Sequence, residues 1–233
     1  MGKAFDPALI FEFLPKLLAY LPVTLFILVA ALFFGLWLAL LIALPRLYNM
    51  PVLSQLAAIY VSFIRGTPVL IQLFLVFYGL PAFLQLFHLD VSRANPLFFV
   101  IATYSLSSAA FFSETIRAAV NSVDRGQIEA AYAAGLTGRQ AFVRIVLPQA
   151  GMIAFPNFAN SVIGFLKDTS LAFSIGVMDM MGRGQTLISA TAHALEVYIG
   201  LAIIYYLVVI VLEKGFARAE RRLQRHERKW ASA

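Results

Sequence analysis

The chain has 233 residues, of which 61% are hydrophobic and only 13% are charged. A soluble domain of this length could not bury so much apolar surface, so we expect an all-α polytopic protein in a lipid bilayer. The absence of cysteine excludes disulfides and thiolate metal sites. The net charge of +6 does not indicate nucleic-acid binding, because the basic residues lie beside apolar stretches and in the C-terminal tail.

The first apolar segments predict an interfacial helix followed by a membrane span. Residues 1–16 mix charged and apolar side chains as a helix at the lipid surface would, with a poorly ordered leader as the alternative. Residues 17–44 are long enough to cross a bilayer, and Pro45 and Arg46 are expected to end that span.

The second span, about residues 52–80, carries an interruption at Arg65-Gly66-Thr67-Pro68. Pro68 has no N–H to donate to the carbonyl of Ile64, so the helix should bend or open there. A charged Arg65 deep in a span costs about 2.5–3.5 kcal/mol on insertion scales, so it should face a cavity, a partner or the nearer interface. Gln72 follows seven residues after Arg65 and would share its helix face.

The third span covers about residues 97–119, after a loop at 81–96. Its small, polar middle, SLSSAAFFSE, is typical of close contacts between membrane helices. Glu114 and Arg117 lie three residues apart near its end, so we expect a local ion pair between them.

Residues 124–148 form the only long polar-mixed segment in the middle of the chain and predict two short helices joined by a tight turn. Asp124 with Gln127, and Thr137 with Gln140, have the spacing of capping boxes at the two helix starts. Gly135 stands where Gly commonly ends a helix. The second helix carries Phe142 on an apolar side and is expected to end at Pro148.

The fourth span, about residues 150–175, is the best candidate for a substrate path. One helical face carries small and polar residues at helical spacing, and a charged group follows it. The face carries Asn157, Asn160, Ser161, Gly164 and Asp168. The candidate path residues in this span are Asn157, Asn160, Ser161, Lys167, Asp168, Thr169 and Ser170. An alternative is that this polar face holds two subunits together, and both interpretations are compatible.

The remaining chain predicts a loop at 178–196, a fifth span at about 197–212 and a charged helical tail at 213–233. With an odd number of spans the two termini lie on opposite sides. A cytoplasmic C-terminus places twelve basic residues inside and four outside, which the positive-inside rule favours. No solenoid repeat or low-complexity linker occurs, so residues 1–233 are expected to form one transmembrane domain.

Several of these stretches resemble bacterial ABC importer permeases. The run Glu129-Ala130-Ala131, then Gly135, Phe142 and Pro148, is similar to the coupling loop of that family. YVSFIRGTPVLIQLF at 60–74, LPQA at 147–150 and KDTSL at 167–171 resemble the branch that carries polar amino acids. The stretch at 60–74, together with ATAHALEVYIGLAIIYY at 190–206, looks most like the cystine-type members.

The resemblance implies a type I ABC importer permease in the bacterial plasma membrane. It implies that the loop at 124–148 docks into a separate ATPase subunit and carries its motion into the membrane. The expected partners are two ATPase subunits, a second permease subunit (identical or a sister chain) and an extracytoplasmic solute-binding protein. The cargo would pass near Arg65, Thr67, Gln72 and the fourth-span residues named above.

The sequence contains no GxxxxGK[ST] phosphate loop, so ATP and Mg are expected on the partner ATPase, with no cofactor, metal or catalytic residue on this chain. Two alternatives remain open at this stage. One is an ion-coupled secondary transporter that uses Glu114, Lys167 and Asp168 as a proton relay. The other is a membrane scaffold that transports nothing.

Overall fold

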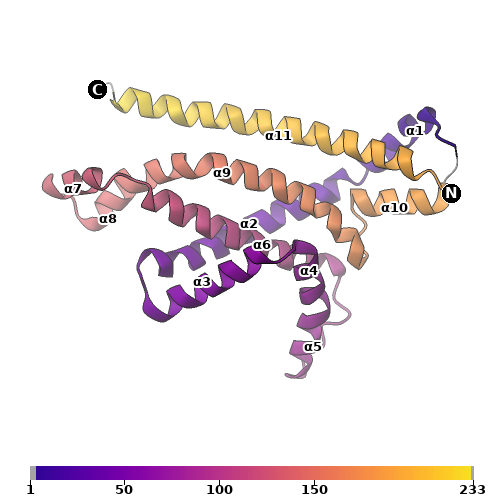
Figure 1. Ribbon diagram of the computed structural model, residues 1–233, viewed down its shortest axis with the longest axis horizontal. Helices are drawn as coiled ribbons and strands as arrows, with labels where there is room; N and C mark the ends of the chain where they lie inside the picture. The colour runs from indigo at the N-terminus through magenta and orange to yellow at the C-terminus, as the bar shows by residue number, and fades with distance from the viewer. Residues whose placement is uncertain (1–3, 232–233) are drawn as a thin grey trace.

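The computed structural model describes the backbone of residues 4–231 and the side chains of residues 4–223. Within that range every regular element is a helix and no β-strand occurs, with short turns and loops between the helices. Four long helices lie alongside one another: α2, α6, α9 and α11 (Figure 1). Their bounds are Leu21–Leu47, Pro96–Asn121, Leu147–Asp168 and Ala194–Ala231.

Shorter helices connect and extend these four. They are α1 (Pro7–Leu18), α3 (Pro51–Gly66), α4 (Val69–Phe74), η1 (Leu75–Gly79), α5 (Leu80–Gln85), α7 (Arg125–Ala133), α8 (Gly138–Ala141), η2 (Phe142–Val146), η3 (Thr169–Ile175) and α10 (Met180–Thr191).

Four described segments are long and apolar enough to cross a bilayer: Leu21–Leu47, Pro96–Asn121, Gly138–Ile175 and Ala194–Leu223. A fifth arises if Pro51–Gly66 and Val69–Gln85 count as one span, although the two limbs meet at 112°. Figure 1 shows α4 and α5 turning away from the long helices. The expected all-α architecture with about five spans is therefore confirmed.

The pair α2 and α6 forms the centre of the bundle because small residues let the two backbones approach closely. Ser108 of α6 is fully buried, and its Oγ lies 3.2 Å from the carbonyl oxygen of Ala31 on α2, to which it donates. A Cβ added to Gly35 would lie only 1.9 Å from Ser108 Oγ, so this crossing has no room for a larger residue.

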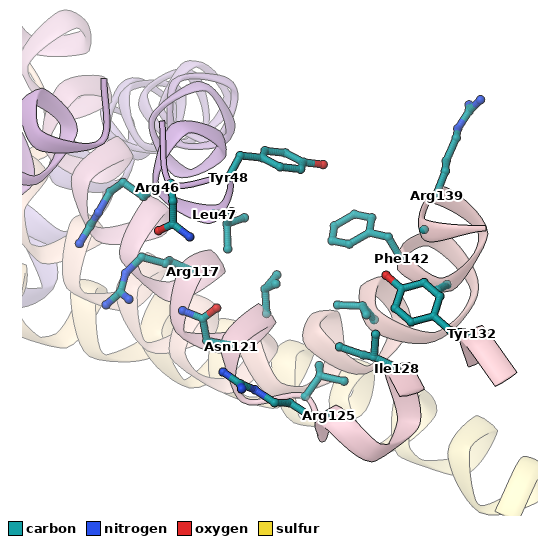
Figure 2. A pocket seen from close by; sticks show the side chains of 16 residues that line it. Arg46, Leu47, Tyr48, Arg117, Asn121, Arg125, Ile128, Tyr132, Arg139 and Phe142 are labelled. Atoms are coloured by element: carbon teal, nitrogen blue, oxygen red, sulfur yellow. The ribbon is translucent and has the colours of Figure 1, made fainter. Parts of the chain in front are cut away.

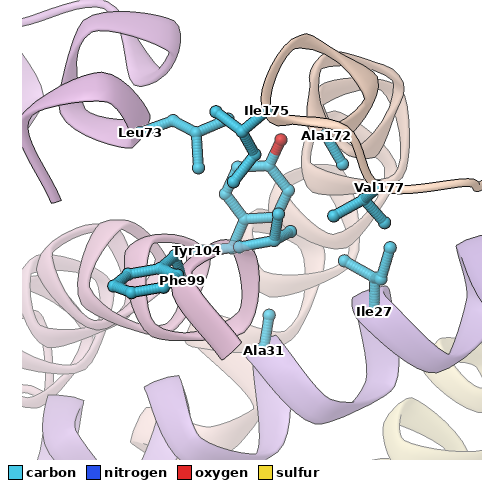
Figure 3. Packing of buried hydrophobic residues seen from close by; sticks show 9 residues of the cluster. Ile27, Ala31, Leu73, Phe99, Tyr104, Ala172, Ile175 and Val177 are labelled. Carbon is cyan, nitrogen blue, oxygen red and sulfur yellow. The ribbon is translucent and has the colours of Figure 1, made fainter. Parts of the chain in front are cut away.

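The largest buried cluster lies where α2, α4, α6 and the η3 segment meet (Figure 3). Tyr104 is buried among Ile27, Leu73 and Ile175, and its hydroxyl donates to the backbone carbonyl of Asp168 at 2.8 Å. The hydrogen bond satisfies the one polar atom of that side chain inside an apolar cluster.

Several sequence-based boundaries are wrong. Helix α2 continues through Pro45 and Arg46 to Leu47, because proline in the last turn removes only one ladder hydrogen bond. The expected loop at 178–196 contains α10, whose start is capped by Asp179. The loop expected at 81–96 begins with the last turns of α5.

The C-terminal span is also longer than predicted. Helix α11 begins at Ala194 rather than near residue 197 and continues without a break through the tail to Ala231, which confirms that the tail is helical. The side chains from residue 224 onward, with their basic residues, lie outside the described part of the chain.

The N-terminal helix α1 packs on the bundle by one side. Phe13 and Leu17 are buried in a cluster with Met180, Val197 and Leu201, whereas Phe11 is 75% exposed. At its start, the backbone N–H of Asp6 donates to Glu196 Oε1 at 2.8 Å, which ties α1 to the first turn of α11. One apolar face against protein and one left uncovered fits the expected interfacial helix.

Candidate functional site: a helical hairpin, a broken helix and an open polar face

The helical hairpin at 124–148 folds largely as its sequence predicts. Asp124 caps α7 by accepting from the N–H of Gly126 at 2.8 Å. Gly135 ends the first helix at a φ of +80°, a conformation that favours glycine. Thr137 and Gln140 form a capping box, in which each side chain accepts from the other residue's backbone N–H.

Two details of the hairpin differ from expectation. Gln127 does not complete a capping box with Asp124; its Oε1 instead lies 3.5 Å from Gln149 Nε2 at the start of α9. The second helix does not end at Pro148, because α8 continues through the π-helical turn η2 directly into α9. Pro148 sits in the first turn of α9, where a missing N–H is tolerated, so the hairpin and the fourth span form one continuous rod.

The hairpin also packs against the ends of two spans. Val146 and Ala150 bury against Ala119 and Val123 of the third-span region, with Phe142 against the same cluster. Ala131 is only 5% exposed, whereas Glu129 and Ala130 face outward. The inner side of the hairpin is thus packed on the bundle, and Glu129 and Ala130 on its outer side are exposed.

The broken helix between α3 and α4 has its backbone extended at Thr67 and Pro68. The break frees the carbonyl oxygens at the end of α3, and two side chains take them. Gln72 Nε2 donates to Ile64 O at 2.7 Å and to Thr67 O at 3.0 Å, and Thr67 Oγ1 donates to Phe63 O at 2.9 Å. Gln72 therefore bridges the bend that Pro68 imposes.

This arrangement contradicts the expectation that Gln72 shares a helix face with Arg65, and it places Arg65 beside an aromatic ring. Gln72 cannot share a helix face with Arg65, because the helix ends between them. Arg65 is exposed, and its guanidinium lies 5.6 Å from the ring centroid of Phe111. Phe111 in turn contacts Phe165 of α9 edge to face at 5.9 Å. Among the described residues no ion pair joins Asp168 to Arg65 or to Lys167.

The open polar face of α9 carries Asn157, Asn160, Gly164 and Lys167, all of which are exposed in the single chain. A Cβ added to Gly164 would meet no atom within 4 Å. The face that the sequence predicts is therefore present and uncovered by the rest of this chain.

Other members of the predicted group are partly or fully buried. Ser161 is half-buried and donates to Asn157 O at 2.9 Å. Thr169 is fully buried, and Ser170 donates to the carbonyl of Lys167 at 2.7 Å.

The expected pair of Glu114 and Arg117 is confirmed and has a third member that the sequence did not reveal. Glu114 Oε2 accepts from Arg46 Nη1 at 2.6 Å, and the same carboxylate also binds Arg117. The link joins the end of α2 to α6. The only hint in the sequence is that Arg46 follows a span directly.

The long apolar helices define a polytopic membrane protein. The chain matches the model of the family "binding-protein-dependent transport system inner membrane component" over residues 31–225, and it belongs to that family. It is therefore a multi-pass inner-membrane transport component.

Two curated relatives cover nearly the whole chain. It is 58% identical over 227 residues to the L-cystine transport system permease protein TcyL of Bacillus subtilis, covering 97% of this chain and 95% of the relative. It is 39% identical over 226 residues to the nopaline transport system permease protein NocM of Agrobacterium fabrum, covering 96% and 94%.

A solved structure agrees with these relatives. The crystal structure of an amino acid ABC transporter with histidines superposes with a TM-score of 0.84 at 29% identity, covering 94% of this chain and all of that one.

Proposed function

We propose that this chain forms the transmembrane path of an ATP-driven importer for a polar amino acid, with cystine as the first candidate. The observation that carries the proposal is the helical hairpin, which presents Glu129 and Ala130 outward and continues as a rod into the fourth span. The 58% identity to a cystine permease supports cystine over the other cargoes named among the relatives.

The hairpin is proposed as the coupling element. Its residues Glu129, Ala130, Ala131, Gly135, Phe142 and Pro148 would receive the motion of a separate ATPase, which binds ATP and Mg. Because η2 and α9 continue the second helix, a push on the hairpin would move the polar face of α9 as one body. This chain itself would carry out no catalysis.

The path is proposed to run between two permease subunits along the open face of α9. Asn157, Asn160 and Lys167 supply polar contacts there, and Arg65 with Thr67 lies at the broken helix. Cystine carries two carboxylates and two ammonium groups, which these mixed polar and charged side chains can match. In a complex of this kind two permease chains join two ATPase subunits and one extracytoplasmic solute-binding protein.

The orientation proposed is N-terminus outside and C-terminus cytoplasmic. It places the hairpin on the side where ATP is available and α1 and α10 on the side of the solute-binding protein. The excess of basic residues around the hairpin and the tail supports it.

The decisive experiment is uptake of radiolabelled cystine by cells with and without the gene, with excess unlabelled arginine, glutamine, glutamate or histidine as competitors. We expect uptake to vanish with the gene and only cystine to compete. Unchanged cystine uptake would remove the cystine assignment, and the deletion strain would then be tested with the other labelled amino acids.

A second experiment separates the importer from its alternatives. Gly135→Asp should abolish ATP-dependent uptake while the protein stays in the membrane, because it adds a charged side chain at the exposed turn of the proposed coupling element. Gly138→Ala is the matched control, since its Cβ would meet only Tyr132 Oη at an ordinary 3.7 Å. For the wild-type protein, uptake that persists without ATP but is lost with a proton uncoupler would identify a secondary carrier. Absence of any solute flux through the wild-type protein would identify a scaffold.

A further inference from the structure

A hollow of about 900 Å³ lies between the hairpin, the end of α6 and the turn that joins α2 to α3. Its sixteen lining residues include four arginines and no acidic side chain. Figure 2 shows Arg46, Arg117, Asn121 and Arg125 in a row along one wall, whereas Arg139 extends away from the hollow at the opposite rim.

The arginine wall carries more positive charge than its neighbours neutralise. Arg46 and Arg117 share one carboxylate, that of Glu114. Among the described residues Arg125 makes no ion pair, and the carboxylate of the adjacent Asp124 accepts from the N–H of Gly126. Three guanidinium groups against one shared carboxylate leave an excess of two positive charges along this wall.

The opposite wall is apolar and aromatic. It consists of Ile128, Tyr132 and Phe142 from the hairpin (Figure 2), and Tyr48 stands at the rim, 68% exposed. The hollow is therefore amphipathic, with cations on one side and apolar surface on the other. It also lies at the ends of two candidate spans, α2 and α6, where a bilayer's headgroups would be.

We propose that this hollow binds a phosphate ester, with the arginine row holding the phosphate and the hairpin wall covering the attached apolar part. Guanidinium groups bind phosphate oxygens through paired N–H donors. Basic pockets between helices on the cytoplasmic side suit anionic headgroups. An anionic phospholipid of the surrounding leaflet fits both walls, and a soluble phosphate fits the arginine wall alone.

The assignment to the cytoplasmic leaflet rests on the proposed orientation of the importer. The consequence is regulatory, since a lipid in this hollow touches both the hairpin and the α2–α3 turn and would set how the coupling element sits on the bundle.

The test is native mass spectrometry of the purified, delipidated permease complex after incubation with phosphatidylglycerol or phosphatidylcholine. The wild type should retain phosphatidylglycerol preferentially. The double variant Arg117→Gln/Arg125→Gln should lower that retention about tenfold, while Glu114 keeps Arg46 as its partner. Arg144→Gln/Arg218→Gln is the matched control, because it removes the same charge from exposed positions outside the hollow.

A second experiment uses inorganic phosphate and measures whether it raises the midpoint of thermal unfolding of the complex. Protection that depends on Arg117 and Arg125, without lipid preference, supports the site with a soluble ligand. Equal retention of both lipids and no phosphate protection, or effects that the variant leaves unchanged, overturn the proposal. Retention is measured without ATP turnover, so a failure of the importer proposal, seen in uptake, is a separate outcome.

Discussion

At the residue scale, Gln72 shows how a membrane chain tolerates a proline in a span. Pro68 cannot donate to Ile64 O, and a free carbonyl in an apolar setting costs several kcal/mol. The side-chain amide of Gln72 replaces the missing N–H. The residue is only 4% exposed, so solvent does not compete for its hydrogen bonds. The break is thus stabilised by side-chain hydrogen bonds from Thr67 at the end of α3 and from Gln72 in α4.

We predict that Gln72→Leu loosens this bend. The variant leaves two carbonyl oxygens without their donor, at a cost of about 1–3 kcal/mol for each group that becomes unsatisfied. The midpoint of thermal unfolding in detergent should fall by several degrees, and uptake should fall at least tenfold. Gln85→Leu, at the exposed end of α5, is the control. A variant as stable and active as the wild type would show that Pro68 alone sets the bend.

Gly35 offers a second test at this scale. Gly35→Ala places a Cβ 1.9 Å from Ser108 Oγ and 3.0 Å from Ser105 O, so it should destabilise the protein by about 1–3 kcal/mol. Adding Ser108→Ala removes the closest contact and should restore part of the loss. Gly151→Ala, where a Cβ meets nothing within 4 Å, should be neutral or stabilising. Thermal unfolding of five proteins checks this: the wild type, Gly35→Ala, Ser108→Ala, the double variant and Gly151→Ala. Additive effects of the two single variants in the double variant would contradict it.

At the element scale, the corner between η3 and α10 is fixed by a buried carboxyl group that the sequence did not reveal. Asp179 is fully buried, and its Oδ1 accepts from the N–H of Gly182 at 2.8 Å. Thr24 Oγ1 lies 3.4 Å from its Oδ2 and also accepts from the N–H of Met180. Burial raises the pKa of Asp179 above its ordinary value, although these donors oppose the shift.

This raised pKa predicts a pH effect with a definite sign. Between the ordinary carboxyl pKa and the raised one, the folded protein binds more protons than the unfolded protein, so this group lowers stability as pH rises. Asp179→Asn keeps an acceptor for Gly182 and removes the titration. The wild type should therefore lose stability relative to the variant as pH rises through that window, in unfolding midpoints measured over a pH series.

The comparison variant for this series is Asp90→Asn. Hydrogen bonds from Ser92 lower the pKa of the exposed Asp90 carboxyl group, so its contribution to stability is lost as pH falls. The two variants should therefore change the pH profile in opposite directions. Parallel curves for the wild type and Asp179→Asn would refute the assignment for Asp179.

The elements also show which features a sequence can predict. Capping at Asp124 and Thr137, the stop at Gly135 and the break at Pro68 depend on neighbouring residues only, and all were predicted. The link from Arg46 to Glu114, the hydrogen bond of Thr24 with Asp179 and the bridge by Gln72 depend on packing or on the direction of a bend. Helix α10 was missed because its glycines resemble a loop, although Gly182 is needed where a Cβ would lie 2.7 Å from the carbonyl oxygen of Val177.

At the scale of the whole molecule, a single chain leaves a polar helix face uncovered. The open polar face of α9 costs free energy in lipid, and no part of the described chain covers it. A second permease chain placed there would cover Asn157 and Asn160 and leave a polar seam between the copies. The sequence left open whether this face forms the path or joins the subunits, and the structure of one chain is compatible with both roles.

Two substitutions on α9 separate those roles. Asn160→Leu removes a polar contact without much bulk, so uptake should fall at least tenfold while the two permease chains still copurify. Gly164→Leu adds bulk where the single chain has open space, so it should hold the copies apart and abolish both copurification and uptake. Ala202→Leu, at an exposed position of α11, adds similar bulk away from this face and should change neither.

Copurification is read from two differently tagged copies and uptake from labelled cystine. If Asn160→Leu transports normally while Gly164→Leu separates the chains, the face joins subunits and the path lies elsewhere. If Gly164→Leu leaves the chains together, the second copy binds another surface, and the apolar limb of α4 and α5 becomes the next to test.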